Sequence, residues 1–187
     1  MTTASWAIGH AARLLRQGAV IACPTEAVFG LSCDPWAIHA VERLLSLKAR
    51  SVEQGFILVA ASREQLRPFV ADTPTPWEGA IAASWPGPTT WLMPCRPEVP
   101  QWLTGGRTTI AVRVTAHPVL AALCERFGGA LISTSANLSG RPPAGSRWKL
   151  HKYFHGRLDA IVPGALGSSP RPTAIRDSRT GRTLRAG

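Results

Sequence analysis

The chain has 187 residues, 45% of them hydrophobic, and a mean hydropathy of +0.03, so we expect one folded domain over residues 1–187. No apolar run approaches the roughly 20 residues that cross a bilayer, and residues 1–17 have no cleavage-site pattern, which predicts a cytoplasmic protein without a membrane partner. The net charge of +10 is uneven, because residues 1–140 hold 11 Lys/Arg and 9 Asp/Glu whereas residues 141–187 hold 10 and 2. The basic last quarter favours contact with tRNA or double-stranded RNA, although a solvated surface would look the same.

The chain begins with a helix and a buried strand. A helical stripe of apolar residues predicts a helix over 5–17, and the continuous apolar run 19–23 predicts a strand that is buried on both faces. Proline has no N–H to donate to a sheet ladder. We therefore expect the strand to stop at Pro24 and to be followed by a compact turn.

A second amphipathic helix follows that turn. Asp34 as N-cap and Pro35 at the first helical position predict its start, and Ile38 begins its buried face. The helix ends near Lys48 and Arg50. These two cations have two interpretations: they complement the helix dipole, or they reach back over the preceding loop and hold an anion.

The rest of the chain alternates between strand and helix patterns. In chain order we expect a strand at 56–60, a short helix at 62–70, a helix at 77–84, a strand at 89–93, a loop at 94–106, a strand at 108–114, a helix at 117–126, a strand at 130–133, a loop at 134–140, a helix at 147–154, and strands near 159–162, 173–176 and 182–184. This alternation predicts an α/β fold with a twisted, open, mixed sheet and flanking helices.

Four features are candidates for chemistry. Arg113 lies on the less hydrophobic face of its strand and needs an anionic partner, either an internal carboxylate or that of a substrate. The small residues of loop 134–140 could bind an anion or nucleotide, or form only a tight turn. Glu26 is an acid–base candidate or a loop cap, and Cys23 a buried hydrophobe or a nucleophile. The sequence has no P-loop, dinucleotide-binding fingerprint or nucleophile elbow.

Five segments in order carry a family resemblance. They are Pro-Thr-Glu-Ala-Val-Phe-Gly-Leu at 24–31, Lys-x-Arg at 48–50, Trp-Pro-Gly-Pro-Thr at 85–89, Ala-Val-Arg-Val at 111–114 with His117-Pro118, and Ser-Thr-Ser-Ala-Asn-Leu-Ser-Gly at 133–140. Together they resemble the YrdC-like family of L-threonylcarbamoyladenylate synthases in its short bacterial form. The resemblance implies a twisted open sheet around a concave, positively charged face.

The activity implied by the resemblance is the synthesis of L-threonylcarbamoyladenylate from ATP, L-threonine and bicarbonate, with release of pyrophosphate. The product would pass to a downstream threonylcarbamoyl-transferase complex that modifies the adenosine beside the tRNA anticodon. Mg²⁺ would accompany ATP, with no protein side chain assigned as its ligand. The alternative is a non-catalytic module that binds tRNA or ribosomal RNA through its basic end.

The resemblance also implies roles for individual residues. The catalytic residues would be Lys48, Arg50 and Ser135. ATP would be bound by Lys48, Arg50, Ser133, Ser135, Asn137 and Arg185. Threonine would be bound by Thr25, Arg113 and Thr173.

The chain departs from the family pattern in places. Ala27 stands where the family usually has threonine, so one hydroxyl contact to substrate is absent. Pro172-Thr173-Ala174-Ile175 resembles a family Pro-Ser-Thr-Ile segment, with Ala174 in place of a threonine. Leu184-Arg185-Ala186-Gly187 resembles the family's Leu-Arg-x-Gly. Because the sequence ends there, we expect it to lack the second domain of longer members.

Overall fold

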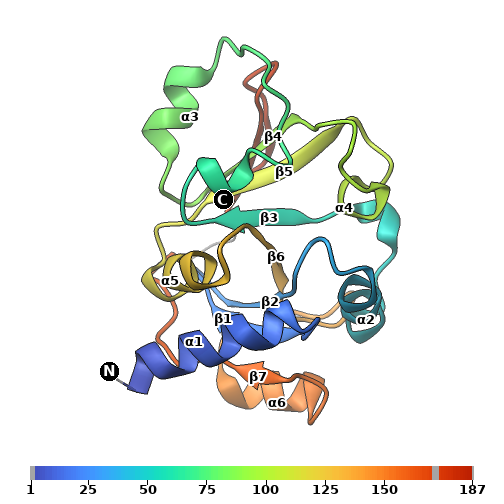
Figure 1. The fold of residues 1–187 in the computed structure, drawn as a ribbon, viewed down its shortest axis with the longest axis vertical. Helices are drawn as coiled ribbons and strands as arrows, with labels where there is room; N and C mark the ends of the chain where they lie inside the picture. The colour runs from blue at the N-terminus through green and yellow to red at the C-terminus, as the bar shows by residue number, and fades with distance from the viewer. Residues whose placement is uncertain (1–2, 170–172, 187) are drawn as a thin grey trace.

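A nine-stranded mixed sheet runs through residues 3–169 and 173–186, the parts of the chain that the computed structural model describes (Figure 1). The strands are β1 (Ile21–Pro24), β2 (Phe29–Ser32), β3 (Ile57–Ala60), β4 (Thr89–Pro94), β5 (Thr109–Val114), β6 (Leu131–Ser135), β7 (Ala160–Ile161), β8 (Ala174–Asp177) and β9 (Thr183–Arg185). Their order across the sheet is β7-β1-β2-β6-β3-β5-β4-β8-β9. The pairs β7/β1, β3/β5 and β4/β8 are parallel and the others antiparallel. The predicted mixed α/β sheet is confirmed.

Helices flank this sheet. They are α1 (Thr3–Arg16), α2 (Ile38–Lys48), α3 (Glu78–Ser84), α4 (Gln101–Thr104), α5 (Pro118–Phe127) and α6 (Arg147–Phe154), with 3-10 turns η1 (Val52–Gln54) and η2 (Glu64–Leu66). Figure 1 shows α1 and α5 together, and they contact each other directly. None of the helices in the described part of the chain has the length and apolar character needed to span a membrane. Pro172 and Gly187, which belong to the two late motifs, lie outside the described residues.

The two faces of the sheet bury different residues, as the two-residue period of a strand requires. Cys23, Val59 and Leu131 pack in the core cluster formed with α1 and α5. Their strand neighbours Ala22 and Leu58 point the other way, into the larger cluster that includes residues of α2, α3, α4 and α6. The helices α1 and α5 thus cover only part of their face, and the rest of that face is where the candidate site lies.

The compact turn predicted after Pro24 is present, and it joins two strands of a hairpin. Pro24 is the last residue of β1 and pairs with Phe29, the first residue of β2. The sequence pattern did not predict the strand β2. The backbone N–H of Thr25 donates to the carbonyl of Val28 and closes the turn at 3.2 Å. The segment Phe29–Ser32 shows no alternation of polar and apolar residues, and all four are buried. Its strand character therefore comes from pairing with β1 and β6 rather than from a local pattern.

The second helix starts later than predicted. Asp34 makes a local turn, because its Oδ1 accepts from the backbone N–H of Trp36 at 2.9 Å, and α2 begins at Ile38. Ile38 is 39% exposed, so the prediction that it is buried is wrong. Ala49 ends the helix in the left-handed conformation and turns the chain sharply before Arg50.

Three other boundaries differ from the prediction. The strand expected at 130–133 continues to Ser135, so the first two residues of the predicted polar loop at 134–140 are part of β6. The loop expected at 94–106 contains α4. The helix expected at 62–70 is only the turn η2, where the Gln65 side chain accepts from the backbone N–H of Ala61 at 2.9 Å. Side chains that bond the local backbone compete with helix hydrogen bonds, which explains this short element.

Candidate active site

A cavity of about 540 Å³ opens on the sheet face beyond α1 and α5. Its floor is a row of paired residues, with Ile57 of β3 aligned to Ala111 of β5 and to Ser133 of β6. Four of its lining residues are arginines, namely Arg50, Arg107, Arg113 and Arg185. Among the described residues that line it, none is Asp or Glu. A concave site with this charge is suited to an anionic ligand of small-molecule size.

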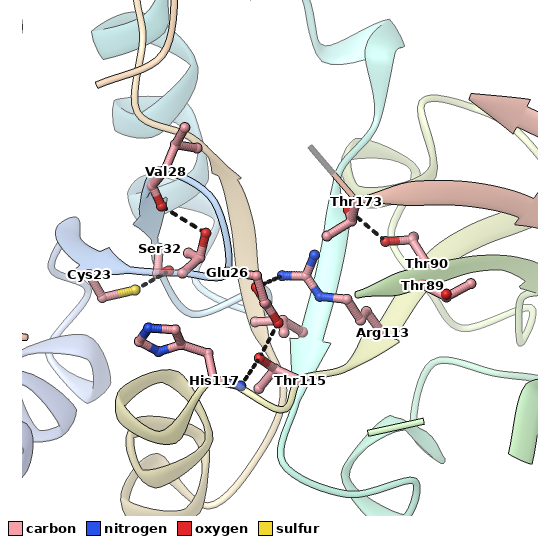
Figure 2. A network of polar contacts seen from close by, with 12 residues as sticks. Cys23, Glu26, Val28, Ser32, Thr89, Thr90, Arg113, Thr115, His117 and Thr173 are labelled. Atoms are coloured by element: carbon pink, nitrogen blue, oxygen red, sulfur yellow. Dashed lines mark hydrogen bonds and ion pairs between the residues drawn. The ribbon is translucent and has the colours of Figure 1, made fainter. Parts of the chain in front are cut away.

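Arg113 lines the cavity and is held in place by a buried polar network (Figure 2). Its Nη2 lies 3.1 Å from Oε2 of Glu26, and both side chains are almost fully buried. The Thr115 hydroxyl donates to the other carboxylate oxygen of Glu26 at 2.6 Å, and the backbone N–H of His117 donates to the Thr115 hydroxyl at 3.1 Å. Burial lowers the pKa of Arg113, whereas Glu26 raises it. The internal carboxylate is thus present, and Arg113 still faces the cavity.

Two arginine donors in the cavity lining remain unused. Within the part of the chain that the structure describes, the buried Nε atoms of Arg50 and Arg113 have no hydrogen-bond partner. Buried donors are nearly always paired in folded proteins. Both side chains line the cavity. A bound anion is the simplest group that would satisfy them.

Arg50 lines this cavity and follows α2 in the chain. Its Nη2 donates to the carbonyl of Gly55 at 2.8 Å, and its guanidinium carbon is 5.5 Å from the centre of the Phe56 ring. These contacts fix the guanidinium plane while leaving other donors free. Burial lowers the pKa of Arg50, so an anionic partner there would be favourable.

Arg107 is a site residue that sequence reasoning missed. It follows α4, and its Nη1 donates to the carbonyl of Thr104 at 3.1 Å. The backbone N–H of Phe56 donates to the carbonyl of Leu103 at 2.9 Å, which brings the segment carrying Arg107 against the segment carrying Arg50. The signal in the sequence is a cation directly after two glycines, Gly105 and Gly106. In the structure both glycines have positive φ.

Lys48 lies beneath the loop after β6, away from the cavity lining. The side chain is 3% exposed, and its Nζ donates to the carbonyl of Ser135 and to both the carbonyl and Oδ1 of Asn137, the last two at 3.0 and 3.1 Å. The Ser135 hydroxyl donates to the same Oδ1 at 2.7 Å. The structure therefore separates the two cations that the sequence places together: Lys48 contacts the loop and Arg50 the cavity.

The position of Lys48 predicts a pH-dependent stability. Burial, and to a smaller extent Arg50, lower its pKa from 10.5 to about 8. The unfolded chain therefore binds the proton more tightly between pH 8 and 10.5, and the folded state gains stability as pH rises through that window. Relative to Lys48→Met, the free energy of unfolding of the native protein should rise by roughly 3 kcal/mol across the window. Denaturant unfolding of both proteins at several pH values measures this difference, and a flat difference would contradict it.

The late strands form another side of the cavity. Nη2 of Arg185, on β9, donates to the carbonyl of Thr173 at 2.7 Å. The Thr173 hydroxyl lies 3.4 Å from the hydroxyl of Thr90. Thr173 and Ile175 line the cavity but Ala174 does not, as expected from the alternation of a strand. The missing hydroxyl at position 174 therefore removes no contact with the cavity.

The hairpin between β1 and β2 supplies Thr25 and Ala27 to the cavity. The Thr25 hydroxyl donates to the carbonyl of Val28 at 2.7 Å, so its first role is to hold the turn. A Cβ at Gly30 would lie 3.0 Å from the Thr25 methyl group, so there is little room for a side chain at this position. Ala27 does face the cavity, so the hydroxyl that it lacks would have been available to a ligand.

A thiol nucleophile fits this geometry poorly. Cys23 is fully buried, its Sγ lies 3.7 Å from the Ser32 hydroxyl, and burial raises the pKa of its thiol to about 11. A thiol in this state is not a nucleophile at neutral pH. No group of three His, Cys, Asp or Glu side chains that could hold a metal occurs among residues 3–169 and 173–186.

Two known proteins are similar to this chain over nearly its whole length. A threonylcarbamoyl-AMP synthase of Halorhodospira halophila is 56% identical over 98% of this chain and 96% of its own. One of Pseudomonas aeruginosa is 53% identical over 94% of each chain.

Among solved structures, P. abyssi Sua5 complexed with L-threonine is 33% identical, with a TM-score of 0.85 over 92% of this chain. The chain spans only 51% of that longer protein. A sequence model of the Sua5, YciO and YrdC proteins, described as "Telomere recombination", matches residues 13–187. The chain therefore belongs to the Sua5/YciO/YrdC family.

Proposed function

We propose that this protein is a threonylcarbamoyl-AMP synthase that uses ATP, L-threonine and bicarbonate. The observation that carries the proposal is the cavity with four arginines and, among its described lining residues, no carboxylate. Relatives about half identical over nearly the full chain bear the same name. An RNA-binding module without catalysis would not need a deep cationic cavity next to a loop of small polar residues.

The reaction brings several anions together. The amine of threonine attacks the carbon of bicarbonate, water leaves, and an N-carboxylate (a carbamate) forms. An oxygen of the carbamate then attacks the α-phosphate of ATP, the bond to the β-phosphate breaks, and pyrophosphate departs with that electron pair. Positive side chains and oriented donors lower the repulsion between the carbamate and the triphosphate. A cavity that excludes water also protects the carbamate and the adenylate from hydrolysis.

We assign the threonine carboxylate to Arg113. Its ion pair with Glu26, which Thr115 in turn holds, fixes the position of the guanidinium. A fixed guanidinium would bind the amino acid in one orientation. Thr173 and Thr25 also line the cavity, and we assign to them a part in the shape that accepts the threonine side chain.

We assign the triphosphate to Arg50 and Arg185, which both line the cavity and come from different parts of the chain, the segment after α2 and the strand β9. Ser133 and Ser135 would contact the nucleotide and the carbamoyl group. The hydrogen bonds of Lys48 suit a positioning role, in which it holds the Ser135–Asn137 segment. Asn137 then acts through the Ser135 hydroxyl that it binds.

The proposed reaction also implies a metal ion and a protein that receives the product. Mg²⁺ would arrive on the ATP phosphates, because no carboxylate lines the described part of the cavity to bind it independently. We place the enzyme in the cytoplasm as one domain over residues 1–187, with its product passed to a transferase complex that modifies tRNA. Contact with tRNA or double-stranded RNA stays a prediction.

The test uses purified protein with ATP, Mg²⁺, L-threonine and labelled bicarbonate. Pyrophosphate release is expected only when all are present, together with a labelled adenylate that chromatography separates from ATP. Replacing threonine by alanine or valine in the assay controls for non-specific carbamate formation. Failure to release pyrophosphate in a threonine-dependent way would overturn the proposal.

A further inference from the structure

Helix α6 and the loop before it present a surface of aromatic and basic side chains that is separate from the cavity. This surface consists of Arg141, Trp148, Lys149, Lys152 and Tyr153, and we call it the α6 surface. Trp148 is 71% exposed, the largest exposed fraction among the large hydrophobic residues described. The helix itself is anchored from its other side, where Leu150 and Phe154 are buried in the core. Trp148 is therefore exposed on a well-anchored helix.

The charge around this surface has one sign. Residues 139–158 contain five Arg/Lys and no Asp or Glu. The next acidic residue, Asp159, is already paired with Arg43 of α2. The positive charge is thus not neutralised by an acid of its own segment, and a polyanion would meet it directly.

The cations and rings are arranged in pairs one helical turn apart. Nζ of Lys152 lies 5.3 Å from the Trp148 ring centre, and Nζ of Lys149 lies 5.8 Å from that of Tyr153. The Tyr153 hydroxyl donates to the carbonyl of Pro142 at 3.0 Å, which ties the preceding loop to the helix. Between loop and helix lies a groove of about 460 Å³. Flat rings beside cations and a groove suit a ligand with both flat rings and phosphates.

We infer that the α6 surface binds an unpaired segment of RNA, with a base stacked on Trp148 and phosphates beside Lys149, Lys152 and Arg141. Stacking on exposed aromatic rings within a basic groove is how proteins hold single-stranded nucleic acid. A membrane fits less well, because the apolar side of α6 is already buried in the core. An acidic peptide would use the cations but would bring no flat ring to stack on Trp148.

The α6 surface also adjoins the candidate active site through one loop. Nδ2 of Asn137 donates to the carbonyl of Arg141 at 2.9 Å, and Pro143 lines the cavity. RNA held here would lie against the outer side of the loop that borders the cavity. The inference goes beyond adenylate synthesis and does not depend on it.

The first experiment compares Trp148→Ala with Trp6→Ala. Trp6 is the matched control because it is 63% exposed, stacks on His10 and lies on α1. The probe is a fluorescently labelled 12-nucleotide oligouridine, with binding measured by anisotropy at low salt. We expect Trp148→Ala to weaken binding about fivefold or more, as loss of one stacked base implies, and Trp6→Ala to leave it unchanged. Unchanged circular dichroism and unchanged pyrophosphate release without RNA would show that the variant is folded.

The second experiment tests the phosphate contacts. For single strands, the logarithm of the binding constant falls with the logarithm of salt concentration by about 0.7 for each phosphate neutralised. The double variant Lys149→Ala/Lys152→Ala should therefore reduce that slope by about 1.4, whereas Arg13→Ala on α1 should not change it.

Three results would overturn the inference. The first is an equal loss of affinity for oligouridine in Trp148→Ala and Trp6→Ala. The second is that an RNA duplex of the same length binds as tightly as oligouridine and that Trp148→Ala does not weaken its binding. The third is that the protein binds anionic lipid vesicles but not oligouridine.

Discussion

Replacing Arg113 by alanine is expected to abolish most of the threonine-dependent activity. The substitution removes the cation assigned to the substrate carboxylate, and the loss of one partner of a buried charged contact costs about 2–5 kcal/mol. The value of kcat/KM for threonine should fall by roughly 30- to 4000-fold. Pyrophosphate release at a series of threonine concentrations measures it. Arg113→Lys should recover little, because an ammonium cannot form the forked contact.

The same substitution also leaves Glu26 buried without its cation. Such an uncompensated charge costs about 3–5 kcal/mol of stability, so a loss of activity alone would not distinguish binding from folding. The control is the double variant Arg113→Ala/Glu26→Gln, whose amide oxygen can still accept from the Thr115 hydroxyl. We expect it to regain much of the stability in urea unfolding while activity stays low. Recovery of normal threonine saturation in the double variant would show that Arg113 does not bind threonine.

Replacing Arg50 by alanine is expected to act on ATP rather than on threonine. Its guanidinium is fixed by Gly55 and Phe56 and faces the cavity, so its contribution to a phosphate would require little reorganisation. Loss of a preorganised charged donor typically lowers activity by about 10²–10³-fold. We expect kcat/KM for ATP to fall by this amount, with a smaller effect on the KM for threonine, as measured by pyrophosphate release at varied ATP.

Arg107→Ala is the comparison for Arg50→Ala. Arg107 lines the same cavity and bonds to a backbone carbonyl in the same way, but its side chain is exposed to solvent. Charges in water interact more weakly with ligands than buried ones. The loss should therefore be smaller, about tenfold. If the two variants behave alike, or if Arg50→Ala leaves the KM for ATP unchanged, the assignment of the triphosphate to Arg50 is wrong.

Much of the fold could be predicted because its patterns are local. The alternation over 108–114 predicts a strand with Ile110 and Val112 on one face and Arg113 on the other, and β5 has this arrangement. Helices α1, α5 and α6 lie within a residue or two of the predicted bounds for the same reason. The strand β2 was missed since its residues are buried on both faces and carry no period. Only contacts with β1 and β6 make it a strand.

Residue types and their spacing were enough to predict a cationic site and the family to which the chain belongs. Only the tertiary structure decided how the charges are used. Glu26 and Arg113 lie far apart in the sequence, and their pairing depends on the fold bringing the turn between β1 and β2 next to β5. Lys48 and Arg50 are neighbours in the sequence, yet the left-handed turn at Ala49 sends them to different partners. The repeat of apolar residues along one helix or strand indicates which of its faces is buried. The burial and ion pairing of a charged side chain depend instead on which other elements pack against it.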